Sequence, residues 1–237
     1  MSFYFLQEVR MAYRTTAKMA ARKEVRRRTF LEAAAHLFGR RGYHATTVPA
    51  IVAGANSSTG SFYAYFRNKE DVFAAVLEEL GERVAAAMSP GEESDPLRRI
   101  EHAVEALFNF LARNPEDARI LIVESSGLSP ELERVRRKIL SRHAQVVQQM
   151  IESQPSAFAE TIPPIAARCL VGAVFESVCS WLEAGADTCK GAEQVAREVA
   201  AYNVRALRAR DESLSGPRFR VPPGEQKRSR AGVANQE

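Results

Sequence analysis

Side chains that can bind phosphates and base edges of nucleic acid are concentrated between residues 46 and 69. Short polar side chains on a helix reach base edges in the major groove, while hydroxyls, lysines and helix N-termini hold phosphates. A glycine among them lets the backbone approach the groove closely. The candidate DNA-binding residues are Thr46, Thr47, Ser58, Thr59, Gly60, Ser61, Tyr63, Tyr65 and Lys69. The alternative is that the hydroxyls only cap helices and that the tyrosines pack in a core.

The element before this stretch is a predicted helix over about residues 25–42. Apolar residues recur every four positions from Phe30 to Phe38, which is the spacing of one buried helix face. Gly42 is the expected end of this helix, because glycine enters the left-handed region without steric cost. Residues 1–24 show no sustained apolar period, and we expect a flexible arm there.

Two short helices joined by a tight turn are predicted next. The first follows Thr46 or Thr47, either of which is a good N-cap. Asn56 tolerates the left-handed conformation that a tight turn requires, and Ser58 can cap the second helix over residues 59–66. Two short helices in this arrangement form a helix-turn-helix.

Charge is divided unevenly along the chain. Residues 1–77 contain 12 Lys and Arg against 5 Asp and Glu, whereas residues 78–210 contain 16 against 20. A basic N-terminal third on a mildly acidic body indicates that one end of the molecule meets a polyanion. A merely solvated basic face is the alternative, so charge alone does not identify the partner.

Residues 25–77 resemble the TetR-type (tetracycline-repressor-like) family of transcriptional regulators. The resemblance rests on the ordered combination of Thr46-Thr47-Val48, the run from Ala55 to Phe66 and Asn68-Lys69-Glu70-Asp71-Val72. Two positions depart from the family pattern. Asn56 stands where the family usually has the turn glycine, and asparagine can adopt that conformation. Ser57 replaces an apolar residue and forfeits some burial between the two helices.

The resemblance implies an all-helical homodimer with a helix-turn-helix domain at each N-terminus and a helical effector-binding domain behind it. It implies that the last two long helices of each copy form a four-helix bundle. It further implies a repressor that is released from a palindromic operator on double-stranded DNA when a small molecule binds. Effector domains of this family diverge widely, so the resemblance identifies no ligand.

Beyond Asp95 the sequence predicts further helices and no strand alternation. Their expected starts are Asp95-Pro96, Asn114-Pro115, Ser129-Pro130, Pro163-Pro164 and about Gly191. The helix over residues 165–183 is apolar nearly all round, and burial against a second copy explains that composition. We therefore expect a homodimer through residues 164–208. A central helix in a monomeric bundle is the alternative.

Signals for an effector site are weaker. Phe108 and Phe175 are candidates for the wall of an apolar cavity, together with Trp181. Glu124 or Glu176 can supply one carboxylate that orients a largely apolar ligand. The alternative is that the aromatic residues pack in the core and the acids lie on the surface.

Enzymatic and metal-binding functions find little support in the sequence. The four histidines and three cysteines lack the spacing of metal ligands, and no Gly-rich phosphate loop or nucleophile elbow occurs. Cys169, Cys179 and Cys189 do not form a disulfide framework and fit a reducing cytoplasm, although one redox-sensing cysteine stays open. No apolar run approaches the roughly 18 residues of a membrane helix. We expect no cofactor, no catalytic residue and no membrane partner.

The predicted fold class is all-α. Its parts are a flexible N-terminal arm (1–24), a three-helix helix-turn-helix domain (25–77), a helical-bundle effector-binding and dimerisation domain (78–210) and a disordered tail (211–237). The predicted function is a cytoplasmic, sequence-specific regulator, a homodimeric repressor released by an effector. Two alternatives stay open: a non-specific architectural DNA-binding protein, and a helical enzyme or ligand carrier with a basic arm. The sequence does not distinguish repression from activation.

Overall fold

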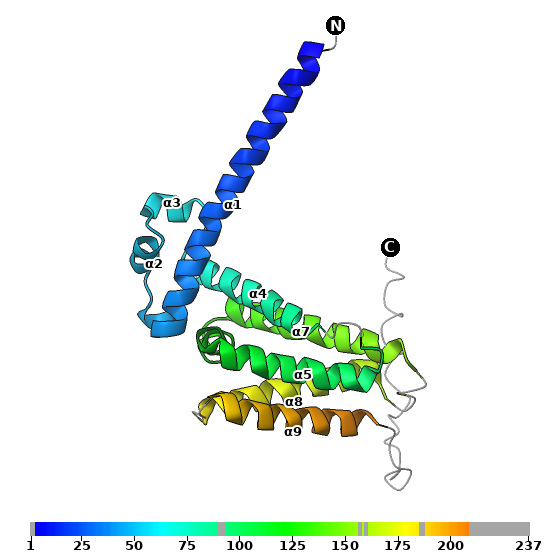
Figure 1. The fold of residues 1–237 in the computed structure, drawn as a ribbon. Coiled ribbons are helices and arrows are strands. Elements are labelled where there is room, and N and C mark those ends of the chain that lie inside the picture. Colours follow the sequence, from blue (N-terminus) through cyan, green and yellow to red (C-terminus); the bar gives the residue numbers. More distant parts are fainter. Residues whose placement is uncertain (1–2, 90–92, 156–157, 159–160, 185–187, 209–237) are drawn as a thin grey trace, which may run out of the picture.

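The computed structural model describes residues 3–89, 93–155, 158, 161–184 and 188–208. These residues form helices and no strand, which confirms the predicted all-α class. Figure 1 shows a long rod, α1 (Phe3–Ala45), beside two short helices, α2 (Val48–Gly54) and α3 (Thr59–Tyr63). From this region α4 (Lys69–Ala87) runs into a layered bundle. We call residues 25–77 the head.

A cluster of phenylalanines holds the head together. Phe30 of α1 meets Phe62 of α3 edge-on, with ring centroids 5.6 Å apart. Phe38 of α1 meets Phe73 of α4 in the same way at 4.8 Å. All four rings are fully buried, and each contributes about 3 kcal/mol of hydrophobic free energy on burial. These contacts fix the angles between α1, α3 and α4.

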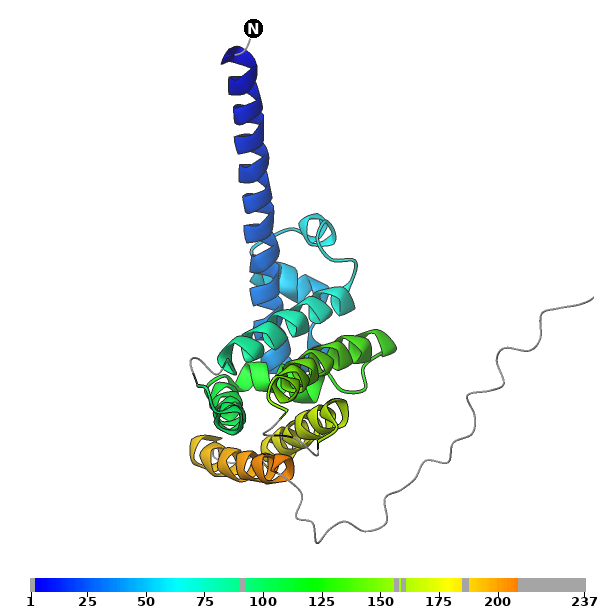
Figure 2. The same ribbon diagram turned by 90° about the vertical axis from the view of Figure 1, so that its right-hand side faces the viewer.

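α1 is longer than the sequence predicted. From Phe3 onward the expected flexible arm is the first half of α1, which projects away from the rest of the molecule (Figures 1 and 2). Residues 3–24 contain no glycine or proline and many strong helix formers, so backbone propensity favours a helix without an apolar stripe. Each of residues 19–26 is exposed to solvent.

The bundle consists of α4 together with α5 (Pro96–Arg113), α7 (Pro130–Glu152), α8 (Pro163–Glu183) and α9 (Thr188–Leu207). α5 packs along α9, and α7 packs along both α8 and α4 (Figure 2). The predicted starts at Asp95-Pro96 and Ser129-Pro130 are confirmed. The side chains of Asp95 and Ser129 accept hydrogen bonds from backbone N–H groups of the first turn, and proline follows each.

Two short segments connect α5 to α7. They are α6 (Pro115–Ala118) and the π-helical turn η1 (Arg119–Glu124). Both pack against α1, and η1 also contacts α4 and α8. π-helical turns are rare and are frequent at functional sites. The connection therefore bridges the head and the bundle.

α8 corrects one expectation about composition. By length and composition alone it is apolar enough to cross a membrane, whereas the sequence analysis found no such run. Core helices of soluble proteins meet the same criterion. Only 22% of its most apolar window is buried within this chain. Ile162, the residue before α8, is 63% exposed, and Ile165 in the first turn of α8 is 57% exposed. A helix of this kind needs further apolar contact.

Some expectations lie outside what the structure describes. The predicted tail over residues 211–237 and the side chain of Cys189 fall there. The hydrophobic cluster of the head also includes Ile120 and Leu132 from the second predicted domain. The domain limits therefore stay a prediction.

Candidate DNA-binding surface and effector cavity

The turn between α1 and α2 is fixed by backbone geometry and two threonines. Gly42 has φ of 82°, which confirms it as the residue that ends the regular helix. Thr47 is the N-cap of α2, with its Oγ1 accepting from the Ala50 N–H at 3.3 Å. Thr46 is fully buried and donates its hydroxyl to the Gly42 carbonyl at 2.8 Å. The Thr46 hydroxyl is therefore engaged within the turn, and a DNA contact of this residue stays a prediction.

The turn between α2 and α3 has the predicted conformation. Asn56 lies in the left-handed region with φ of 46°, a conformation that asparagine tolerates. Ser58 caps α3 by accepting from the Ser61 N–H at 3.2 Å. Gly60 faces open space, since a Cβ there would meet nothing within 4 Å. The turn thus presents the start of α3 to solvent, where a DNA backbone can approach.

The two tyrosines have different surroundings. Tyr63 is 55% exposed and available for contact with DNA. The Tyr65 ring is half-buried and lies 5.9 Å from the Phe30 ring, so a large part of it belongs to the head core. Thr59, beside the cap of α3, is exposed like Tyr63. Thr59 and Tyr63 are therefore the strongest of the predicted contacts on α3.

Lys69 lies at the start of α4 as predicted, but its ammonium group is already engaged. Nζ donates to the Tyr43 carbonyl at 2.8 Å and lies 4.2 Å from the centre of the Tyr43 ring. Desolvation by burial lowers the pKa of Lys69. A phosphate contact would have to compete with these bonds.

Arg67, which the sequence analysis did not select, is the more accessible cation near the start of α4. Its side chain is 85% exposed, and its guanidinium pairs with Asp71 at 3.0 Å. The hydrogen bond from Arg67 is the main reason that the pKa of Asp71 lies below its usual value. Its position just before the Asn68 cap is the feature of the sequence that could have identified Arg67 as a candidate.

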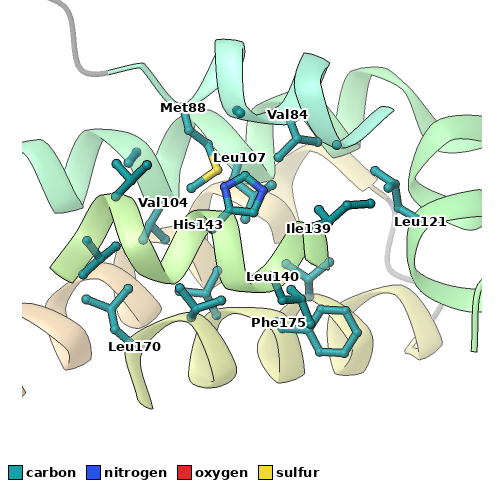
Figure 3. Close-up of a pocket in the computed structure, with 18 of the residues that line it drawn as sticks. Val84, Met88, Val104, Leu107, Leu121, Ile139, Leu140, His143, Leu170 and Phe175 are labelled. Carbon is teal, nitrogen blue, oxygen red and sulfur yellow. The ribbon is translucent and has the colours of Figure 1, made fainter. Parts of the chain in front are cut away.

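A cavity of about 320 Å³ lies inside the bundle, between α4, α5, α7 and α8. This volume is in the range of small-molecule sites. Figure 3 shows apolar side chains around it, with the His143 ring among them. Its lining includes Leu77, Val84, Met88, Ala103, Val104, Leu107, Leu121, Ile122, Ile139, Leu140, Leu170, Val174 and Phe175.

Few polar groups reach this cavity. Burial, reinforced by nearby Arg142, lowers the pKa of His143, which favours the neutral imidazole. Arg99 contributes a buried Nε that has no hydrogen-bond partner among the described residues. Arg136 stacks its guanidinium over the Phe175 ring at 5.2 Å. The cavity thus suits an apolar body with few polar contacts.

Four of the five predicted ligand contacts do not line this cavity. Phe108 and Trp181 are buried against each other in the core, with ring centroids 5.6 Å apart. Glu176 lies outside the lining, and Glu124 faces α1 instead. Phe175 alone among them lines the cavity. The cavity-lining face of α7, which carries His143, was missed because residue types alone do not show where helices leave space.

Glu124 joins the cavity region to the head. Its Oε2 accepts the Tyr43 backbone N–H at 2.7 Å, and its Oε1 pairs with Arg119 at 3.0 Å. A Cβ at Gly42 would lie 2.9 Å from Oε1, so glycine is needed for this approach. The neighbouring Leu121 and Ser125 line the cavity. One turn of π-helix therefore contacts both the cavity and the turn that positions α2.

The cysteines and histidines are candidate metal ligands and reactive groups in the described part of the chain. No group of three His, Cys, Asp or Glu side chains suited to a metal ion occurs among the residues whose side chains are described. Burial raises the pKa of the Cys179 thiol, which disfavours the reactive thiolate. Cys169 is exposed.

Comparison with known proteins gives the same type of N-terminal domain. The sequence model of the bacterial regulatory proteins of the tetR family matches residues 30–76. The uncharacterised HTH-type transcriptional regulator YdgC of Bacillus subtilis is 29% identical over 67% of this chain and 82% of its own length. The HTH-type transcriptional repressor ComR of Escherichia coli is 31% identical over 48% of this chain, which spans 56% of ComR.

Solved structures share the fold of this chain. FadR from Bacillus subtilis, determined in complex with stearoyl-CoA, superposes with a TM-score of 0.66 over 74% of this chain and 96% of FadR. Its sequence identity is 20%, so this likeness concerns the fold alone.

Proposed function

Residues 30–76 place this chain in the tetR family of bacterial regulatory proteins, and from that premise we propose that it is a homodimeric repressor released from its operator by a small, largely apolar effector. DNA binding and transcriptional regulation follow from the family. Release by an effector is supported by the η1 segment, which contacts both an apolar cavity and the head that presents α3.

The exposed apolar surface of α8 and α9 supports the homodimer. Ile165 on α8 and Tyr202 on α9 are 57% and 61% exposed. Exposed large apolar side chains on adjacent helices favour association with an equally apolar surface. A second copy of residues 164–208 supplies such an apolar surface. A two-fold dimer then presents two heads to a palindromic operator.

Removing side chains from α3 tests sequence-specific binding. Thr59→Ala and Tyr63→Ala are each expected to weaken binding to the operator about 10- to 100-fold, because each deletes a contact to bases or adjacent phosphates. Binding to a scrambled duplex should change little, since charge governs it. Fluorescence anisotropy with both duplexes measures the two affinities. Equal loss on both duplexes would instead support a non-specific architectural protein.

Long-chain acyl thioesters are the first effector class to test. FadR, whose fold this chain shares, binds stearoyl-CoA. The apolar cavity here suits an alkyl chain, and Arg99, whose buried Nε has no partner among the described residues, is a cation for an anionic end. Arg136 also lines the cavity but is paired with Glu133. An effector that prefers the non-binding arrangement of the heads lowers operator affinity by its differential affinity for the two arrangements.

Filling the cavity tests whether it is the effector site. In Ala103→Phe the new ring occupies the space beside Val104 and Leu107, so the effector should bind at least about 10-fold more weakly. Isothermal titration with stearoyl-CoA, or with whichever effector releases the wild-type protein, measures this change. The operator affinity of the effector-free variant is the control and should stay within about twofold. Unchanged effector binding would place the site elsewhere.

A further inference from the structure

The first half of α1 carries a row of basic residues beyond the head. Arg10, Arg14, Lys18, Arg22 and Arg26 recur at every fourth position. A step of four residues turns an α-helix by about 40°, so neighbours in the row share a face that winds slowly around α1. No acidic residue interrupts the segment from Arg10 to Arg22. The backbone register therefore produces a continuous basic stripe.

The head end of this stripe adjoins the turn that precedes α3. Arg26 Nη1 donates to Ser57 Oγ at 3.5 Å, directly before the Ser58 cap. Arg22 and Arg26 also border a hollow between α1 and the end of α2, at Ala55. The stripe thus continues from the proposed DNA-reading surface along the projecting part of α1 (Figure 1).

Charge repulsion opposes this arrangement in the free protein. Like charges four residues apart destabilise a helix, and helices without tertiary contact are marginal in water. Residues 19–26 are exposed, and the contact of Arg26 with Ser57 lies at the head end of the stripe. A polyanion would relieve the repulsion along the stripe. Duplex DNA already lies at the neighbouring head in the proposed function.

We propose that residues 10–22 of α1 are a second DNA-binding element, which follows the phosphate backbone beyond the bases read by α3. This inference rests on the proposed DNA binding by the head. Twelve residues of helix rise about 18 Å, which matches the axial length of about five base pairs. This element increases the affinity for DNA and lengthens the stretch of DNA that the protein covers. It adds no base preference, because its contacts go to phosphates.

Neutralising the stripe tests the proposal in the full-length protein. The arm variant is R10Q/R14Q/K18Q, since glutamine preserves helix propensity and removes charge. The control variant, R98Q/R113Q/R137Q, removes the same charge from exposed positions of the bundle. Affinity for operator and scrambled duplexes is measured across a salt series. The arm variant should lower the salt slope by about 2.7 units for each engaged head, at 0.9 per phosphate contact, and the control variant should not.

The outcomes distinguish the proposed DNA-binding arm from the proposed sequence-specific regulator on which it rests. A shortened footprint of the arm variant, with an unchanged selected consensus, would support a phosphate-binding arm. Equal salt slopes for wild-type protein and arm variant would overturn the arm, whatever the sequence preference. A lower slope for the arm variant in a protein that selects no consensus would keep the arm and reject the specific regulator. A chain that begins at Met19 is a second variant and should reproduce the loss of slope.

Discussion

Glu124→Ala is expected to weaken operator binding about 10- to 100-fold and to make the remaining binding nearly insensitive to effector. The Glu124 side chain is 12% exposed and holds the Tyr43 backbone N–H at 2.7 Å. Hydrogen bonds to charged groups contribute about 1.5–3 kcal/mol, which corresponds to this range of affinity. Without the carboxylate, the turn at Gly42 that positions α2 is no longer tied to η1.

Operator titrations with and without saturating effector measure this effect. The ratio of the two dissociation constants should fall toward one in Glu124→Ala and should be partly preserved in Glu124→Gln, which keeps the acceptor oxygen. Exposed Glu82→Ala is the matched control and should behave as wild type. A normal ratio in Glu124→Ala would mean that the coupling between cavity and head takes another route, such as α4.

Phe30→Ala is expected to destabilise the protein by about 3–5 kcal/mol, the usual cost of removing a buried phenylalanine. The Phe30 ring is fully buried and contacts the rings of Phe62, Tyr65 and Phe66. Its loss leaves a cavity at the point where α1 supports α3. The free energy of unfolding, from urea titration followed by circular dichroism, measures the change.

A nearby position on the same helix supplies the control for this substitution. Val25 is 68% exposed, and Val25→Ala should change the free energy of unfolding by no more than about 0.5 kcal/mol. Comparable losses in the two variants would contradict the aromatic cluster as the support of the head.

Local signals made the helix ends of the head predictable. The caps at Thr47, Ser58 and Asn68 each use a side-chain oxygen and the N–H three residues later. The positive φ at Gly42 and Asn56 follows from residue types that tolerate it. Such features depend on a few consecutive residues, so the sequence contains all the information they need.

Hydrogen bonds inside the protein engage several polar side chains that were predicted to bind DNA or a ligand. Thr46 and Lys69 were selected as polar residues at helix starts, and they donate to the Gly42 and Tyr43 carbonyls. Glu124 was assigned to a ligand, yet its partner lies 81 positions earlier. The residue types were correct indicators of hydrogen bonding in each case. For Glu124 and Lys69, the packing of α1 against η1 and α4 decides which partner is bound.

The cavity was unpredictable for a related reason. An apolar stripe is the same in sequence whether it faces another helix or an empty space. Phe108 and Phe175 are equivalent in type, but the first is core and the second lines the cavity. The length of α1 escaped prediction because high helix propensity without amphipathic period resembles a polar arm.

Selection of bound sequences from a random duplex library by the purified full-length protein tests the central claim most directly. The account predicts a palindromic consensus whose two half-sites are read by α3 of two heads. It further predicts that the protein with Tyr63→Ala selects a weaker consensus from the same library. Recovery of duplexes with no shared sequence, bound in proportion to charge alone, would contradict a specific dimeric regulator.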